Sequence, residues 1–221
     1  MNYFIIGDIH GCYHTFCSLL EQWDSSNEHL ILVGDLIDRG NYSWLVVEKC
    51  LALLSDTTLS VTVLKGNHEA ELIQYIKDGC HEIWTSQCGL ATLEDFQRHH
   101  VDLQNLLPHL EKLPLKFETS SFIVTHAEVC ETINPYDESN WDGVLWTRKP
   151  LVNLQKLQVH GHTPLKQNHP QYTLDSHSYN IDTGAYYGYG LTGIKLEQVA
   201  TVIEIINIPT DRRDIASENN E

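Results

Sequence analysis

Five short apolar runs, each leading within three residues to an acid, an amide or a histidine, constrain this chain more than any other feature of its sequence. They occupy residues 3–6, 30–33, 61–64, 122–124 and 157–159. Each run has the length of a β-strand, is rich in β-branched or aromatic residues, and stops at a strand-breaking residue. The runs therefore predict buried strands with polar residues gathered at their ends.

Amphipathic helical patterns over residues 13–23 and 44–54 separate the first three runs, which predicts βαβ units and an α/β fold. A longer interval at residues 69–116 predicts a small helical cap insertion, and residues 179–181, 190–196 and 199–208 predict hairpin strands. We expect a single domain over residues 1–208. The polar tail at 209–221 is expected to be disordered.

The charge balance excludes several classes of partner. The chain has 221 residues, with 14 Lys and Arg against 30 Asp and Glu, for a net charge of −16. Such a surface repels nucleic acid and anionic membranes, so we expect neither as a partner. An anionic substrate fits only where something reverses the sign locally, as bound divalent metals would.

The cysteines and the beginning of the chain indicate a cytoplasmic protein. No apolar run is long enough to span a membrane, and no signal segment is evident. The six cysteines form no C-x-x-C pair, which favours reduced thiols over a zinc site or disulfides. Cys12 is the only cysteine that lies near the strand-end motifs in the sequence.

Metal-competent side chains follow all five predicted strands. These are Asp8, His10, Asp35, Asn67, His68, His126 and His162. Taken singly, each is typical of a turn, a helix cap or a core histidine, but together they offer oxygen and nitrogen donors suited to borderline-hard divalent metals. The set exceeds what one ion needs. It suits two ions if Asp35 bridges them, with Asp8 and His10 on one side and Asn67, His126 and His162 on the other.

The motifs that carry these residues resemble those of a known family. GDIHG at residues 7–11, GDLIDRG at 34–40 and GNHE at 66–69 resemble the three signature motifs of the phosphoprotein phosphatases, a family of calcineurin-like metallophosphoesterases. THA at 125–127 and GHTP at 161–164 resemble its later histidine motifs, and NIDTGA at 180–185 resembles a segment of its bacterial and phage members. The length and LWTR at 145–148 are most similar to the small phage lambda-type and bacterial serine/threonine protein phosphatases.

The resemblance implies a fold and a set of roles. The fold would be a sandwich of two mixed β-sheets flanked by helices. His68 would be the general acid and Asp38 would orient it, while Arg39, Arg148 and Asn67 would bind the substrate phosphate. A hydroxide bridging two divalent ions would attack phosphorus directly. We expect manganese, with iron, zinc, cobalt and nickel as alternatives.

The substrate stays open between two classes. The first is a phosphorylated protein or peptide, which we favour because the cap region carries few aromatic or cationic residues. The alternative is a dinucleoside polyphosphate, as in symmetrical diadenosine tetraphosphate hydrolases. A surface position is the alternative for Arg148, and the loop at 186–189 is either a substrate groove or a packed hairpin. A binding module without activity is disfavoured because every expected ligand is present.

Overall fold

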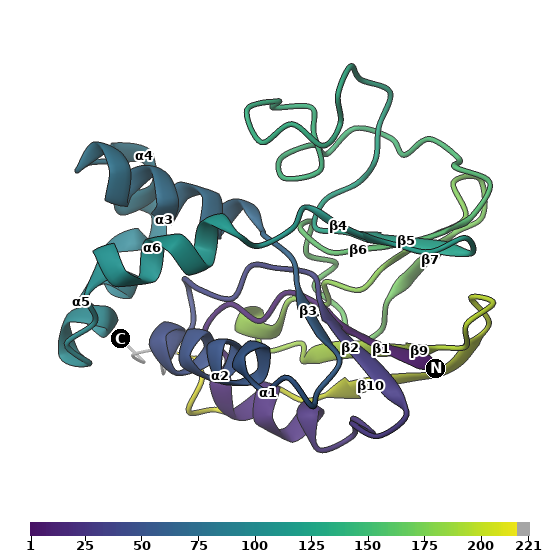
Figure 1. Cartoon of the computed structure of the whole chain (residues 1–221), viewed down its shortest axis with the longest axis horizontal. Helices are drawn as coiled ribbons and strands as arrows, with labels where there is room; N and C mark the ends of the chain where they lie inside the picture. Colours follow the sequence, from purple (N-terminus) through teal and green to yellow (C-terminus); the bar gives the residue numbers. More distant parts are fainter. Residues whose placement is uncertain (216–221) are drawn as a thin grey trace.

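The computed structural model describes residues 1–215, in which two five-stranded β-sheets face each other (Figure 1). The first sheet has the order β10-β9-β1-β2-β3. Its strands are β1 (Asn2–Ile6), β2 (Glu28–Leu32), β3 (Val61–Val63), β9 (Leu191–Leu196) and β10 (Val202–Ile208). The first three strands pair in parallel, as their βαβ spacing predicts, and β9 and β10 form an antiparallel hairpin beside β1.

The second sheet has the order β4-β5-β6-β8-β7 and is also mixed. Its strands are β4 (Lys116–Glu118), β5 (Phe122–Thr125), β6 (Leu157–His160), β7 (Gln171–Thr173) and β8 (Ser178–Asn180). The three inner strands run parallel, and both edge strands pair antiparallel. Two mixed sheets with flanking helices confirm the predicted fold class.

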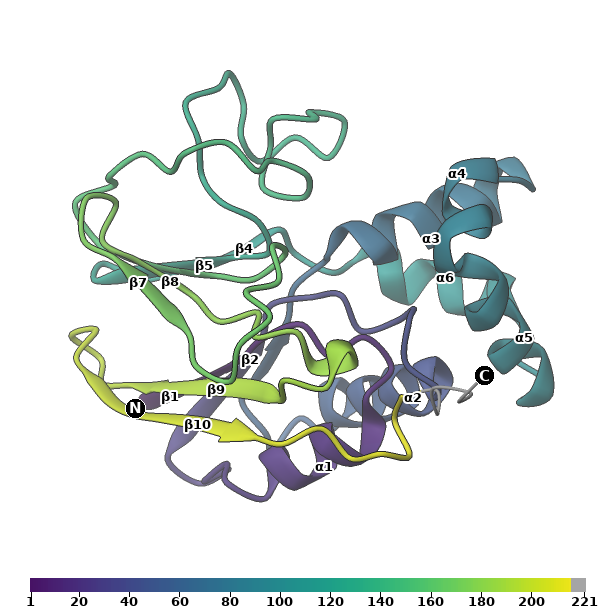
Figure 2. The same ribbon diagram turned by 180° about the vertical axis from the view of Figure 1, so that it is seen from behind.

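Helices cover the first sheet and one side of the molecule. They are α1 (Tyr13–Leu20), α2 (Ser43–Ser55), α3 (Asn67–Asp78), α4 (Glu82–Trp84), α5 (Leu90–Arg98) and α6 (Leu103–Glu111), with a π-helical turn at Thr85–Gly89 and a short 3-10 turn at Ala185–Tyr187. The outer face of the first sheet lies against α1 and α2, and α3 to α6 stand to one side (Figure 2). These four helices fall within or at the start of the segment expected to form the cap insertion. No helix in residues 1–215 is both long and apolar enough to cross a membrane.

Residues 4–6 of β1 are buried on both faces of the first sheet: their side chains point to opposite sides in turn, and each side packs against a hydrophobic cluster. Ile5 of β1 packs toward the second sheet in a cluster that includes Val124 and Val159. Phe4 and Ile6 belong to a second cluster shared with the helices. Each such fully buried side chain contributes roughly 1.5–3 kcal/mol. This packing fixes the strand ends from which the candidate site is built.

The prediction of a disordered tail from residue 209 is wrong for residues 209–215. The Asp214 side chain is fully buried and accepts hydrogen bonds from the backbone N–H groups of His14 (2.9 Å) and Thr15 (2.7 Å). Ile215 packs against the main core cluster. Polar composition suggested disorder, but one buried carboxylate docks this segment on α1. Residues 216–221 lie outside the described part of the chain.

Candidate metal and phosphate site

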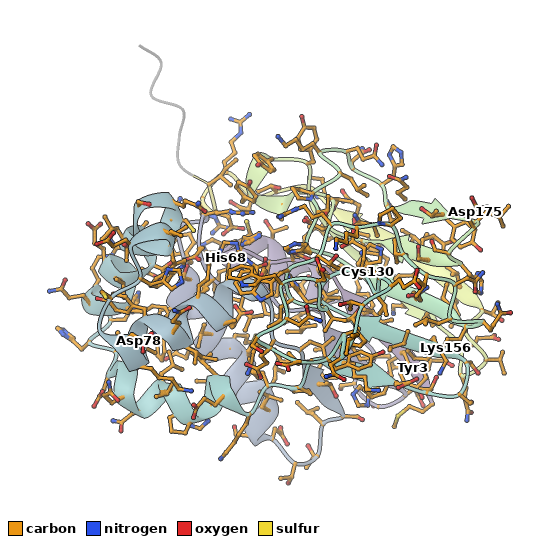
Figure 3. All side chains as sticks on the ribbon, turned by 90° about the horizontal axis from the view of Figure 1, so that it is seen from above. Tyr3, His68, Asp78, Cys130, Lys156 and Asp175 are labelled. Atoms are coloured by element: carbon orange, nitrogen blue, oxygen red, sulfur yellow. The ribbon has the colours of Figure 1, made fainter. Side chains whose placement is uncertain are left out.

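The loops that leave the strand ends place the predicted metal ligands at one edge shared by the two sheets. Asp8 and His10 follow β1, Asp35 follows β2, Asn67 opens α3 after β3, His126 follows β5 and His162 follows β6. All six side chains are buried. Figure 3 shows His68 between the helices and the β-strands. The structure thus brings together residues that lie up to 154 positions apart in the sequence.

Asp35 lies at the centre, and its two carboxylate oxygens face different histidines. Oδ2 is 3.5 Å from Nε2 of His10, and Oδ1 is 3.4 Å from Nε2 of His126. Burial alone would raise the pKa of Asp35, but His126, His68 and the other surrounding imidazoles outweigh it and lower the pKa. An ionised carboxylate with each oxygen turned to a separate ligand group is the geometry that a bridging ligand requires.

Asn67, His126 and His162 form the group on one side of Asp35. The Asn67 Oδ1 atom lies 3.0 Å from Nε2 of His126 and 2.9 Å from Nδ1 of His162, and these two ring nitrogens are 3.1 Å apart. Three donor atoms at such separations point to a common centre. Oxygen and imidazole donors in this mixture suit a borderline-hard divalent ion.

Backbone carbonyls fix the orientation of each histidine expected to bind metal. The carbonyl partners are Ile37 for Nδ1 of His10 (2.9 Å), Val33 for Nδ1 of His126 (3.1 Å) and Trp146 for Nε2 of His162 (3.2 Å). A ring nitrogen that donates to a carbonyl leaves the lone pair of the other nitrogen facing the centre. Burial lowers the pKa of all three histidines, that of His10 to about 3, which favours the neutral imidazole that binds a metal ion.

Asp8 supplies the clearest sign that a cation belongs here. Its Oδ2 accepts the N–H of His162 at 3.0 Å, while its buried Oδ1 has no hydrogen-bond partner among residues 1–215. Burial, Asp182 and Asp35 raise the pKa of Asp8 well above its usual value. A buried carboxylate next to other carboxylates is stable in ionised form only beside a cation. The residues present therefore fit divalent metal ions on both sides of Asp35.

His68 and Asp38 form a buried pair beside the metal ligands. Nδ1 of His68 lies 2.5 Å from Oδ2 of Asp38, and Nε2 of His68 is 3.7 Å from Oδ2 of Asp35. Burial opposes a charge on the imidazole, but Asp35 and the hydrogen bond to Asp38 outweigh it and raise the pKa of His68 well above its ordinary value. The imidazole therefore holds a proton close to the centre between the ligand groups.

Two arginines flank this centre. The Arg39 Nη1 atom lies 3.1 Å from Nε2 of His10, and the guanidinium sits 4.7 Å above the ring of Tyr186. The Arg148 side chain is exposed, two residues beyond the Trp146 carbonyl that holds His162. Burial first, and then positive charges that include Arg148, lower the pKa of His162.

The loop at 186–189 contacts the site, a possibility that the sequence left open. Tyr186 lies edge-on to His10 with ring centroids 5.3 Å apart, and Tyr187 stacks on Tyr186 at 3.8 Å. Tyr187 is 42% exposed, and Lys166 lies over its ring at 4.4 Å. The first tyrosine of the loop therefore packs into the wall of the site, whereas the second faces outward.

Several residues of the site adopt a left-handed backbone conformation that side chains other than glycine rarely take. Their φ values are 47° for His10, 49° for Asp35, 72° for Asp38, 71° for Arg39 and 70° for His162. Such strain persists only where the surroundings over-determine the conformation, and it gathers at functional sites. The buried Glu69 does so for Asp35 by accepting three backbone N–H groups, from Asp35 (2.9 Å), Leu36 (2.8 Å) and Gly66 (2.8 Å).

Sequence reasoning missed three side chains that contact Asp38. Trp84 and Thr92 donate hydrogen bonds to its carboxylate, and the Cys88 Sγ atom lies 3.4 Å from its Oδ2. Cys12 is buried near the first motif, but Cys88 is the cysteine that reaches the His68–Asp38 pair. The intervals of four residues between positions 84, 88 and 92, which line one face of a helix, were the available signal.

A buried set of carboxylates, an amide and imidazoles at the ends of parallel strands, with arginines and a protonated histidine beside it, defines a metal-dependent phosphoesterase site. The comparisons with known proteins agree. Residues 1–194 match the model of the calcineurin-like phosphoesterases. The chain belongs to this family, as its motifs suggested, and is a hydrolase.

Two differently named kinds of enzyme are among the curated relatives of this chain. The chain is 29% identical to serine/threonine-protein phosphatase 1 of Salmonella typhimurium, over 87% of this chain and 91% of that protein. It is 27% identical to the asymmetrical bis(5'-nucleosyl)-tetraphosphatase PrpE of Bacillus subtilis, over 96% of this chain and 97% of that protein. The match to the first supports the predicted likeness to bacterial phosphoprotein phosphatases.

Solved structures share the fold. A putative diadenosine tetraphosphatase superposes with a TM-score of 0.69 at 21% identity, covering 96% of this chain and 94% of that one. A protein serine/threonine phosphatase from Saccharomyces cerevisiae gives a TM-score of 0.67 at 14% identity, covering 96% and 80%. Both likenesses concern the arrangement of sheets and helices alone.

Proposed function

We propose that this protein removes phosphate from serine and threonine side chains of phosphorylated proteins or peptides, with two divalent ions and with His68 as general acid. The observation that carries the proposal is the pairing of His68 with Asp38 beside Asp35, because it places a proton next to the metal ligands. An alkoxide is a poor leaving group, so proton donation as the ester bond breaks raises the rate by about 10²–10⁴-fold.

Asp8, His10 and Asp35 would hold one ion, and Asp35, Asn67, His126 and His162 the other. When bound, such a pair of ions would withdraw charge from the phosphate oxygens and supply a nucleophile from water at neutral pH. The set holds oxygen and nitrogen donors without a thiolate, which suits manganese and leaves iron, zinc, cobalt and nickel as alternatives. We take manganese as the working assignment, from the resemblance of the motifs.

Arg39 and Arg148 would bind the phosphate oxygens of the substrate. A guanidinium offers two parallel N–H donors that match two oxygens of one phosphoryl group. Arg39 is held in place by the Tyr186 ring and by its left-handed backbone, whereas Arg148 projects from an exposed loop. The Asn67 side chain would turn its amide toward the same phosphoryl group while its carbonyl oxygen ligates.

The buried state of the helical segment supports a protein substrate. Trp84 and Phe96, two of its aromatic residues, are 0% and 1% exposed, so neither can stack on a base. The acidic chain also offers few cations for a chain of four phosphates, which needs several positive partners. A single phosphoryl group on a peptide requires only the two arginines and the metal ions.

A second candidate, hydrolysis of dinucleoside tetraphosphates, is favoured by the name of the Bacillus subtilis relative and by one feature of the surface. Trp141 is 73% exposed and lies 4.7 Å from the ring of Trp146, whose carbonyl oxygen binds His162. An exposed indole close to the metal ligands could stack on a nucleobase. The relative is named asymmetrical, whereas the motifs alone suggested the symmetrical reaction.

A competition assay separates these candidates. Purified protein with Mn²⁺ receives a phosphothreonine peptide and diadenosine tetraphosphate at equal concentration, and the products are separated by chromatography. Free phosphate with intact dinucleotide supports the proposal. ADP as the first product indicates symmetrical cleavage, and ATP with AMP indicates asymmetrical cleavage, and either would contradict it. His68→Ala should lower peptide hydrolysis by about 10²-fold or more, while His169→Ala, an exposed histidine outside the motifs, serves as the matched control.

A further inference from the structure

The helical segment from α4 to α5 saturates the carboxylate of Asp38 with hydrogen bonds. Oδ2 accepts the indole N–H of Trp84 at 2.7 Å, in addition to the contact with His68. Oδ1 accepts the hydroxyl of Thr92 in a short hydrogen bond. Both donors lie in the insertion rather than in the metal-binding motifs. Two donors on separate oxygens fix the carboxylate plane, and the plane of the carboxylate fixes the ring of His68.

The lack of a side chain at Gly89 makes room for the Trp84 indole in this position. The Trp84 side chain is fully buried, and a Cβ atom at Gly89 would lie only 2.5 Å from the indole Cδ2 atom. The Tyr75 ring also lies close to the indole, with ring centroids 5.4 Å apart. The π-helical turn between Trp84 and α5 widens the helix at this point, and such turns recur at functional sites. The only polar atom of the indole side chain is therefore aimed at Asp38.

Thr92 is anchored on the opposite side by the start of α2. Its Oγ1 atom lies 3.3 Å from Oγ of Ser43, and that Oγ accepts the backbone N–H of Asp38 at 3.0 Å. One turn further along α5, Oδ2 of Asp95 accepts the backbone N–H of Trp44 at 2.8 Å. The helix that carries Thr92 is thus tied to α2 at two levels, so a shift of α5 away from Asp38 would break both contacts.

From these contacts we infer that Trp84 and Thr92 are positioning residues of the general acid: they hold Asp38, and through it His68, in the orientation that protonates the leaving oxygen. The inference rests on the proposed function of His68. Proton transfer requires the donor nitrogen within hydrogen-bond reach of the leaving oxygen, and a displacement of about 1 Å can cost 10²-fold in rate. The helical insertion is then part of the catalytic apparatus, although its residues do not touch the substrate.

The leaving group provides the test. An alkyl oxygen, as in phosphothreonine, needs a proton when it leaves, whereas p-nitrophenolate is stable enough to leave without one. We expect Thr92→Val and Trp84→Phe, in the full-length protein with Mn²⁺, to lower kcat on a phosphothreonine peptide by about tenfold or more. On p-nitrophenyl phosphate the loss should be under about threefold, and KM should stay near the wild-type value for both substrates. Thr92→Ser, which keeps the hydroxyl, should restore most of the activity on the peptide.

A control in the same helical region separates positioning from general destabilisation. Ser86→Ala removes a hydroxyl of the π-helical turn that donates to the carbonyl of Ile83. This variant should not change the ratio of the two activities. Thermal unfolding of every variant shows which of them fold. If Thr92→Val does not fold, Trp84→Phe tests the inference by itself.

The outcomes also separate this inference from the proposed function. Equal losses on both substrates, or no loss on either, with an active wild type would overturn the positioning role and leave the function of His68 untouched. A wild type that hydrolyses neither ester would overturn both. If His68→Ala loses activity equally on the two esters, His68 is not the general acid, and the inference falls with that role.

Discussion

A Cβ atom placed on Gly161 would lie 1.8 Å from Oδ1 of Asp8, far closer than a carbon and an oxygen that are not bonded can approach. This oxygen is the buried one that has no hydrogen-bond partner among residues 1–215. The lack of a side chain at Gly161 therefore leaves the space in which the Asp8 carboxylate, at the end of β1, can face a metal ion.

Gly161→Ala should consequently weaken metal binding while the fold survives. The new methyl group displaces the Asp8 carboxylate, and changes of this kind around a ligand typically cost about 10–100-fold in metal affinity. Titration of the metal-free protein with Mn²⁺ in a calorimeter measures the loss, and circular dichroism reports the fold. Asp8→Ala should give a similar loss. An Asp8→Ala variant that binds Mn²⁺ like the wild type would show that Asp8 is not a ligand.

Glu69→Gln should destabilise the protein even though Glu69 is not expected to bind metal or substrate. The carboxylate accepts three backbone N–H groups around Asp35, and a glutamine has one acceptor oxygen in place of two. A buried N–H without a partner costs about 1–3 kcal/mol. Urea unfolding measures the change. Glu94→Gln, an exposed glutamate on α5, is the matched control and should alter the free energy of unfolding by under about 0.5 kcal/mol.

The buried Glu128 should make the stability of the metal-free protein fall as pH rises. Burial raises the pKa of Glu128 from 4.5 to about 7, and Oε2 has no hydrogen-bond partner among the described residues. Between these two pKa values the folded chain keeps a proton that the unfolded chain releases, so folding loses free energy over this window. Above pH 7 both states are ionised and the full cost is present.

Glu128→Gln removes this titration. Relative to the wild type, the variant should therefore gain stability between pH 4.5 and pH 8, by up to about 3 kcal/mol. Urea unfolding at both pH values measures the difference. Equal offsets at the two pH values would contradict the raised pKa of Glu128.

Much of the fold was readable because it rests on local patterns. Apolar runs such as that before Asp8 end at strand breakers, and parallel strands bring their ends to one edge, so the proximity of Asp8, Asp35 and Asn67 followed from spacing alone. Short polar edge strands escaped this reasoning. Gln171–Thr173 forms β7 because β8 offers it an edge, and its own sequence has no apolar period.

The surroundings of Asp38 were not readable for a different reason. The indole of Trp84 and the hydroxyl of Thr92 reach Asp38 only because α5 docks on the start of α2, which is a contact between segments about fifty residues apart. Local periodicity can place Trp84 and Thr92 on one face of a helix, but it does not say which segment that face contacts. The roles of the site residues stay predictions, although the structure gathers them in one place.

Asp214 caps helix α1 from a distant part of the chain. The residue before α1, Cys12, offers no side-chain hydrogen bond to the helix, and Asp214 instead accepts the N–H groups of His14 and Thr15 and the hydroxyl of Thr15 at 2.6 Å. A carboxylate at a helix N-terminus satisfies donors that the helix leaves free and faces the positive end of its dipole.

Asp214→Ala leaves these buried donors without a partner and should lower the free energy of unfolding by about 2 kcal/mol or more. Asp211→Ala removes a carboxylate paired with the exposed Arg213, so its urea midpoint should shift far less than that of Asp214→Ala. Equal urea midpoints for the two variants would show that the segment after residue 209 does not stabilise α1.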